Sequence, residues 1–262
     1  DNNRVFILGG MGTQEAKLPD TQNQTMIYDV LNKKFSLSNK LNFKRWYGSI
    51  VITGDEKMFM FGGEDTATFE LSTIPEFIDL KNLDKGWQIL NQSESNDLFG
   101  DVDHNQEWFY PKAFLASDGN IVGISYNKTW VMDFKNNYNV FKTGEIPLVK
   151  SGLPDEFFQS NYSHAKHSHM NNKSDEKHEV ENIKLLTIGS PVGPKSSAVM
   201  IEKDKVLVFG GKQTGKQYAP SNKVYLIDFS NSFKPKIEEL NSLNFARANG
   251  NATLLPDGTI FC

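Results

Sequence analysis

The stretch that decides the fold is Val5-Phe6-Ile7-Leu8-Gly9-Gly10, an apolar strand that closes on a glycine pair. The same pattern returns at Met58–Gly63 and at Val206–Gly211, and a shorter copy without the glycine pair lies at 121–125. The second glycines of the first two copies are 53 residues apart, and the final Thr259–Cys262 would place its own second glycine 53 residues after Gly211. A repeat of this length is a supersecondary unit used several times over.

Turn and strand signals around the repeat predict an all-β chain. Tight turns such as Asp118-Gly119 and Pro256-Asp257-Gly258 precede the repeated strands, and glycine there supplies the positive φ that a hairpin needs. After each loop comes a strand with an aromatic residue and an Asp, as in Thr25–Asp29, Thr129–Asp133 and Val224–Asp228. Four short strands in about 50 residues are typical of a kelch-type β-propeller blade. We expect the glycine-pair strand to be the inner strand of each blade.

Composition excludes several classes of protein. The 262 residues are 38% hydrophobic and 23% charged, with a net charge of −4, so they can form a sizeable core but lack the basic balance of a general nucleic-acid binder. No apolar run is long enough to span a membrane as a helix. One cysteine, Cys262, excludes an intrachain disulfide and a Cys-based zinc site. The chain begins at Asp1 and stops within an expected strand, so we expect an internal piece of a larger protein.

The repeats predict one partial propeller domain over residues 1–262, with about three complete blades and a partial blade at each end. A polar insertion at about 151–182 interrupts it and carries four of the five histidines. We interpret this insertion as a solvated connection between strands. The other interpretation is a metal site formed by His164, His167 and His169, but no expected strand or helix fixes these rings.

Four further segments resemble the galactose oxidase and glyoxal oxidase family of copper-radical oxidases. They are Leu41–Ser49 with its Arg-Trp-Tyr, Thr73–Asp79 with its Ile-Pro-Glu, Glu107–Phe114, and Asn244–Gly258. Ser196–Met200, before the third glycine pair, adds to the match. The resemblance covers nearly all of the chain outside 151–182 and implies that family's seven-bladed propeller.

This resemblance implies the oxidation of a primary alcohol, an aldehyde or a carbohydrate by O₂, which gives hydrogen peroxide. In the family, copper is held by two Tyr and two His, and one Tyr is a radical cross-linked to a Cys. Tyr47 falls at the cross-linked tyrosine, so it is the candidate catalytic, cofactor-binding and metal-binding residue. The alternative is that Tyr47 is an aromatic residue of an inner strand.

By the same resemblance, the remaining ligands lie outside this chain. The cysteine would precede Asp1, and the Tyr-His pair and last His would follow Cys262, so we expect the chain alone to bind no copper. We expect Cys262 to be a small core residue.

Two departures put the substrate in doubt. The chain has Glu64-Asp65 where galactose oxidase has a tryptophan over the radical ring, and Trp46 would point away from Tyr47 on a strand. It also has Gly250-Asn251 where related proteins often have His-Asn.

A non-catalytic propeller that binds a protein or a glycan is the main alternative function, because one scaffold hosts both. A hydrolase is a weaker hypothesis, since no paired carboxylates or nucleophile can be placed. Six Asn-x-Ser/Thr sequons favour an exported, extracellular protein, as the family resemblance also does; they begin at Asn23, Asn91, Asn127, Asn161, Asn172 and Asn251.

Overall fold

A computed structural model describes residues 3–10, 23–68, 70–100, 110–147, 149–150, 188–189, 195–211 and 220–262. The all-β prediction is confirmed, because antiparallel strands make up nearly all of the regular structure described. The helical elements in these ranges are one turn of α-helix, α1 (Asn96–Phe99), and two 3-10 turns at Leu83–Lys85 and Asn91–Ser93. None of the described helices is long and apolar enough to cross a membrane.

Three sheets have four strands each, and a smaller sheet lies at either end of the described chain. The four-stranded sheets are β4 (Ser49–Ile52), β5 (Lys57–Phe61), β6 (Glu76–Asp79) and β7 (Gln88–Ile89); β8 (Lys112–Leu115), β9 (Ile121–Ser125), β10 (Lys128–Asp133) and β11 (Asn139–Glu145); and β14 (Ser196–Glu202), β15 (Lys205–Gly210), β16 (Val224–Asp228) and β17 (Lys236–Leu240). The smaller sheets are β1 (Arg4–Leu8), β2 (Thr25–Asp29) and β3 (Lys34–Leu37) at one end, and β18 (Thr253–Leu254) and β19 (Ile260–Phe261) at the other. A short pair, β12 (Val149–Lys150) and β13 (Ile188–Gly189), completes the set.

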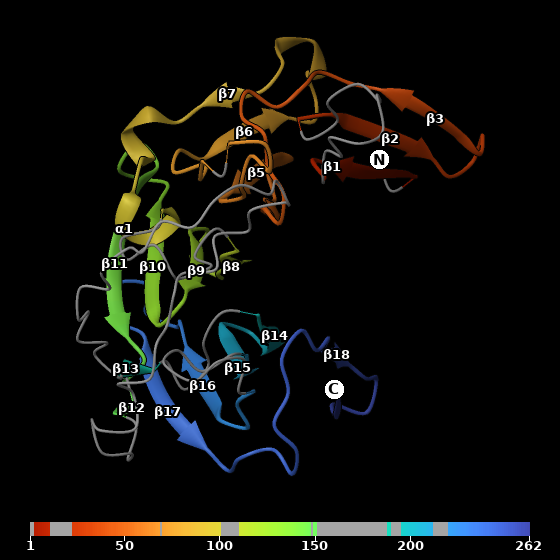
Figure 1. Ribbon diagram of the computed structural model, residues 1–262. Coiled ribbons are helices and arrows are strands. Elements are labelled where there is room, and N and C mark those ends of the chain that lie inside the picture. Colours follow the sequence, from red (N-terminus) through yellow and green to blue (C-terminus); the bar gives the residue numbers. More distant parts are fainter. Residues whose placement is uncertain are drawn as a thin grey trace, which may run out of the picture.

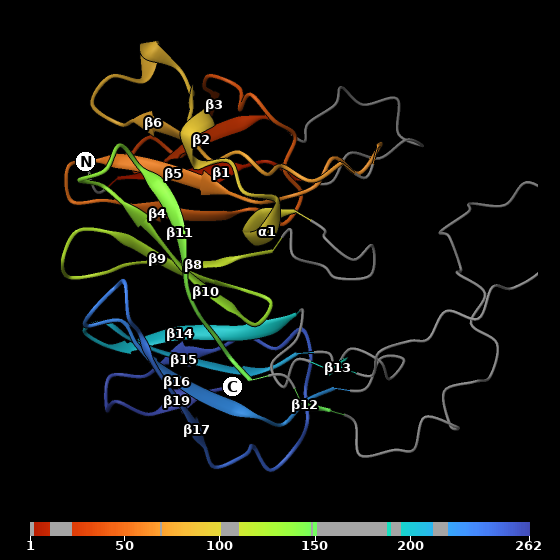
Figure 2. The ribbon, with the colours of Figure 1, turned by 90° about the vertical axis from the view of Figure 1, so that its left-hand side faces the viewer.

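The sheets stand side by side along an open arc (Figures 1 and 2), and the first strand of each four-stranded sheet lies on the concave side. The expectation that the glycine-pair strand is innermost is therefore wrong. That strand is second in its sheet, as β5 lies between β4 and β6. Its glycines are needed for another reason. Gly63 has φ +94°, and a Cβ there would lie 2.7 Å from the Cβ of Arg45.

The hydrophobic core lies between neighbouring sheets. Buried residues of β5 and β6 meet those of β9 and β10, and a second cluster joins the β8–β11 sheet to the β14–β17 sheet. Trp130 of β10 is fully buried and donates a hydrogen bond from Nε1 to Ser125 Oγ at 3.0 Å. A Cβ at Gly123 would overlap its indole ring. This contact explains why the repeat at 121–125 has its glycine within the strand.

Two sequence interpretations concern the remaining segments. Cys262 is exposed, so its expected place in a core is wrong for the described chain. It adjoins β19, the second strand of a sheet in which two strands are described, so little covers it. The insertion at 151–182, with His164, His167 and His169, lies outside the described residues.

Candidate functional site

Tyr47 lies just before β4, on the segment that leads into the concave edge of its sheet. Its φ is +62°, and 48% of its surface is exposed. The alternative interpretation, in which Tyr47 is an aromatic residue of an inner strand, does not fit, because Tyr47 lies outside the described strands. The left-handed backbone breaks the strand two residues before Ser49 and turns the phenol outward. An aromatic residue in this conformation is uncommon and marks a position that its surroundings enforce.

The same left-handed residue brings Trp46 and Tyr47 together. On a continuous strand their side chains would point to opposite faces. Their ring centroids are instead 4.3 Å apart with an interplanar angle of 32°. The expectation that Trp46 points away from Tyr47 is thus wrong, and an indole lies against the phenol ring.

A buried ion pair holds the segment that presents Tyr47. Arg45 Nε donates to Glu76 Oε1 at 2.9 Å, and neither side chain has any exposed surface. The guanidinium also donates to the carbonyl oxygens of Gly62 at 2.5 Å and of Ile74 at 2.6 Å. Glu76 accepts two further bonds, from the backbone N and Nδ2 of Asn42. Burial lowers the pKa of Arg45, and the charge of Glu76 opposes that shift. A fully bonded buried pair of this kind fixes a loop in one position.

The chain contains a second copy of this framework. Leu-Asn-Phe-Lys-Arg at 41–45 returns as Leu-Asn-Phe-Ala-Arg at 243–247. The carbonyl oxygens of Arg45 and Arg247 accept equivalent bonds from the second glycines of the preceding sheets, Gly10 N at 3.2 Å and Gly211 N at 2.8 Å. Arg247 Nε is buried without a hydrogen-bond partner in the described part of the chain.

Strand register identifies equivalent positions on the concave side of the arc. The first-strand residues that pair with Phe61, Ile124 and Phe209, at or one residue before the end of the second strand, are Ser49, Lys112 and Ser197. Two positions before them lie Tyr47, Tyr110 and Lys195. The Tyr47 and Tyr110 rings contact each other across the boundary between two sheets, with centroids 5.1 Å apart. The site is therefore a run of three rings, Trp46, Tyr47 and Tyr110.

Lys112 extends this run. Ser49 and Ser197 donate from their hydroxyls to carbonyl oxygens of the following sheet segment, at Pro111 and Gly250. Lys112 has no such short side chain, and its Nζ lies 3.2 Å from the centroid of the Tyr110 ring. Burial lowers the pKa of this amine to about 7.

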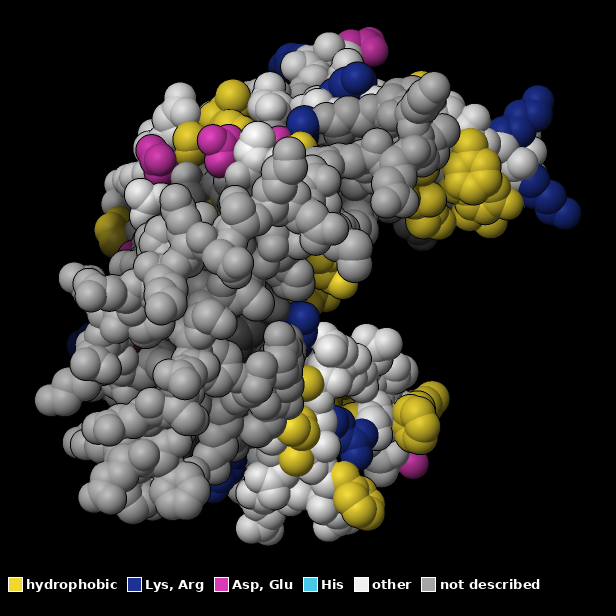
Figure 3. All heavy atoms as spheres, in the orientation of Figure 1, with side chains coloured by type: hydrophobic (Ala, Val, Ile, Leu, Met, Phe, Trp, Pro, Cys, Tyr) yellow, Lys and Arg dark blue, Asp and Glu magenta, His cyan; other side chains and the backbone are white. Residues whose placement is uncertain are grey.

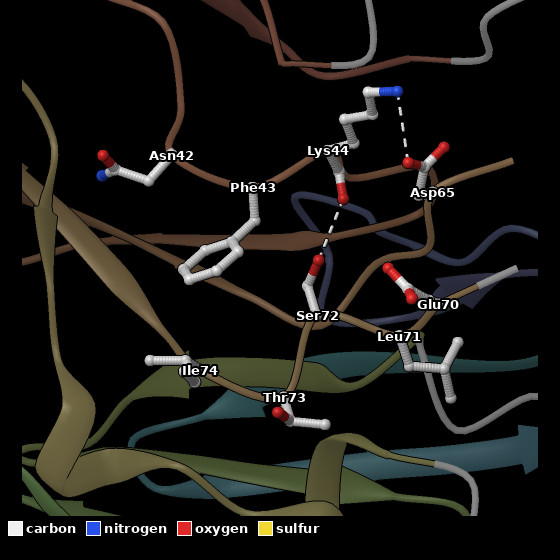
Figure 4. Close-up of a pocket in the computed structure, with 9 residues that line it drawn as sticks. All are labelled: Asn42, Phe43, Lys44, Asp65, Glu70, Leu71, Ser72, Thr73 and Ile74. Atoms are coloured by element: carbon white, nitrogen blue, oxygen red, sulfur yellow. Dashed lines mark hydrogen bonds and ion pairs between the residues drawn. The ribbon is translucent and has the colours of Figure 1, made fainter. Parts of the chain in front are cut away.

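Two grooves lie near these strands, and Tyr47 lines neither. One, of about 270 Å³, lies beside the Arg45 segment and is lined by Asn42, Phe43, Lys44, Asp65, Glu70, Leu71, Ser72, Thr73 and Ile74. Two interactions join residues that line this groove (Figure 4). They are the Lys44–Asp65 ion pair, of 3.2 Å, and the hydrogen bond from Ser72 Oγ to Lys44 O. The other, of about 540 Å³, lies at the opposite end of β4, among the turns at 53–55 and 115–120. Tyr110 does not line either groove, and both rings are partly exposed.

The donors around Tyr47 can be compared with those a copper ion needs. The phenol is exposed and can serve as one ligand. No group of three or more His, Cys, Asp or Glu residues suited to a metal ion occurs in the described ranges. The described residues thus supply one suitable copper ligand, the phenol of Tyr47. Further ligands would have to come from outside the described residues.

Comparisons with known proteins bear on the fold. No protein-family profile and no curated protein sequence matches the chain. Among solved structures it is similar to a fungal alcohol oxidase of the AA5 family in complex with copper, with a TM-score of 0.64 and 17% identity over 98% of this chain and 44% of that one. It is also similar to YjhT, with a TM-score of 0.60 and 12% identity over 98% of this chain and 68% of that one. At these identities the likeness shows the fold alone, and the chain spans less than half of the alcohol oxidase.

The sequence analysis placed Tyr47 but gave no role to Tyr110, Lys112 or Glu76. Each lies in a segment that resembles the family. The segments could be recognised from the sequence, but the contacts of these three residues could not. A usable signal was present for Glu76. It is a charged residue at the start of a strand that is otherwise apolar up to Asp79, and such a residue needs a buried partner. No comparable signal marks the contact between Tyr110 and Tyr47, because it joins two sheets.

Proposed function

We propose that the chain is part of a copper-radical oxidase that oxidises a primary alcohol or an aldehyde, with Tyr47 as a copper ligand and radical site. The observation that carries the proposal is the placement of Tyr47. Its phenol is exposed on the concave side of a fold similar to that of a copper alcohol oxidase, at the position that the family resemblance assigns to the radical tyrosine. The remaining ligands would come from sequence outside the described residues.

The residues of this chain would contribute positioning and protection. Bound copper would supply one-electron redox chemistry at the phenol oxygen. Arg45 and Glu76 would help to hold Tyr47 at a fixed position, since the pair is buried and lies two residues from it. Trp46 would cover one face of the phenol ring and limit its access to water. Tyr110 contacts the ring from the neighbouring sheet.

The finer architecture belongs to the same proposal. Three four-stranded sheets with a smaller sheet at either end suit a kelch-type propeller, which further blades would close into a seven-bladed ring. Export from the cell is also proposed. Of the sequons within the described ranges, Asn91 and Asn251 are exposed and open to a glycan. Asn127 is buried and donates from Nδ2 to Ile146 O, so a glycan there is incompatible with the folded chain.

A second candidate function is a propeller that binds a protein or a glycan without catalysis. The exposed rings of Tyr47 and Tyr110 favour it, because aromatic side chains are frequent anchors of binding surfaces. The substitution Tyr47→Phe in the full-length protein separates the two functions. An oxidase loses peroxide formation from a primary alcohol or an aldehyde, because the ring without its hydroxyl cannot bind copper. The matched control is Tyr28→Phe, a tyrosine of β2 whose ring packs against that of Phe35. Peroxide formation that survives Tyr47→Phe would overturn the assignment, and a copper-loaded protein without peroxide formation on either class of substrate would favour the binding module.

A further inference from the structure

Lys112 stands out among the equivalent positions of the three four-stranded sheets. The corresponding residues are Ser49 and Ser197, whose short side chains bond to the next sheet segment. Lysine at this position introduces a charge into a place that the fold elsewhere fills with a hydroxyl. A residue that departs from the local pattern of its own repeats is a candidate for a functional role.

The described residues give Lys112 no carboxylate. The strands on either side of β8 are β4 and β9, and neither carries an ionisable side chain. Among the described residues, the Tyr110 ring lies against the Lys112 amine, and the Tyr47 ring lies against the Tyr110 ring. Contact with the Tyr110 ring stabilises an ammonium modestly. Burial acts in the opposite direction and lowers the pKa of the amine to about 7, so an anion placed beside it would restore the interaction lost with water.

The surroundings of this cation suit a small molecule. Tyr110 is 38% exposed and Tyr47 is 48% exposed, so both rings can be reached from the concave side of the arc. Figure 3 shows hydrophobic side chains together with Lys or Arg along this inner margin. A ligand with a flat apolar or sugar face can lie on the rings while its charged group reaches the amine.

We propose that Lys112, Tyr110 and Tyr47 form a binding site for a small organic carboxylate, in which Lys112 pairs with the carboxylate and the two phenol rings contact the ring of the ligand. A lysine presents its charge as a compact, rotatable donor, which suits a single carboxylate on a mobile ligand. The site needs no copper. It therefore stands whether the protein is an oxidase or a binding module.

The test is calorimetric titration of the metal-free protein with glucuronate and with glucose, a pair that shares a sugar ring and differs at the carboxylate. We expect glucuronate to bind about tenfold or more tightly than glucose, and Lys112→Met to remove that preference. Lys112→Arg keeps the charge and should retain most of it. Lys205→Met is the matched control, because Lys205 is paired with Glu202 away from the site.

A loss of binding by Lys112→Met can be distinguished from a loss of folding. Lys112→Met removes a desolvated charge from a half-buried position, so its midpoint of thermal unfolding should equal or exceed that of the wild type. Equal affinity for glucuronate and glucose would overturn the proposal. So would a Lys112→Met variant that keeps the preference for the carboxylate.

Discussion

Arg45 and Glu76 form a salt bridge of 2.9 Å between side chains that have no exposed surface. Arg45 stands two residues before Tyr47, and Glu76 begins β6, the third strand of the same sheet. The pair therefore ties the segment that presents the exposed phenol to the interior of its sheet. This buried contact lies two residues from Tyr47 and helps to fix the position of that segment.

Removing one partner of this pair should be costly. Glu76→Gln leaves the Arg45 guanidinium buried without a counter-charge, and we expect the free energy of unfolding to fall by about 3–5 kcal/mol. Urea denaturation followed by tryptophan fluorescence measures it. Glu202→Gln is the control, since its pair with Lys205 is exposed and should contribute less than about 1 kcal/mol. A loss from Glu76→Gln as small as that of the control would contradict the role given to the pair.

Gly123 should tolerate no side chain. Its α-carbon faces the buried indole of Trp130, so the methyl group of Gly123→Ala has to displace that ring. We expect a loss of about 1–3 kcal/mol, as overpacked cores show. Gly54→Ala, where a Cβ meets nothing within 4 Å, is the matched control. Equal stabilities of the two variants, measured by chemical denaturation, would argue against this packing.

The backbone of Tyr47 gives an order of stabilities that a strand residue would reverse. At φ +62° asparagine is tolerated and a β-branched residue is strained, so Tyr47→Val should be less stable than Tyr47→Asn by about 1–2 kcal/mol. Phe35, an exposed residue of β3, is the control. There valine should be the more stable substitution, because strands favour β-branched residues. Thermal unfolding of the four variants tests this. If valine is more stable than asparagine at both positions, Tyr47 lies in a strand and the left-handed backbone is contradicted.

Lys112 should make stability depend on pH. Burial lowers the pKa of its amine to about 7 in the folded state, whereas in the unfolded chain the pKa is near 10.5. Between these values the unfolded chain binds the proton and the folded chain does not, so raising the pH favours folding. The free energy of unfolding of the wild type should therefore rise relative to that of Lys112→Met between pH 7 and about pH 10. A constant difference, measured by urea denaturation at several pH values, would show that the amine is well solvated.

The all-β fold could be predicted from the sequence because its signals are local. Two of these signals, the glycine pair after an apolar strand and the Asp-Gly turn, each involve only a few neighbouring residues. The third is the regular 53-residue spacing at which the pattern returns. The order of strands within a sheet was not accessible in the same way. The glycine pair allows the backbone to approach Arg45 closely. This pair follows the second strand of the sheet, not the first.

The sequence supplied a candidate residue but not its surroundings. The Arg-Trp-Tyr segment made Tyr47 the candidate, whereas the left-handed φ at that residue is set by contacts that no short pattern records. The strand rule therefore placed Trp46 on the wrong side. The approach of Tyr110 to Tyr47 depends on how two sheets pack, and no pattern in the 62 residues between them indicates it.

The central claim, that Tyr47 becomes a radical site joined to a cysteine, is tested most directly by mass spectrometry of a tryptic digest. The full-length protein is first incubated with Cu(II) and O₂. Trypsin cuts after Arg45 and Lys57, so Tyr47 lies in the peptide 46–57. Our account predicts that this peptide is recovered joined to a cysteine-containing peptide, with a mass two hydrogen atoms below the sum of the two, and that Tyr47→Phe abolishes the joined product. Quantitative recovery of the unmodified peptide 46–57 from the copper-loaded protein would contradict it.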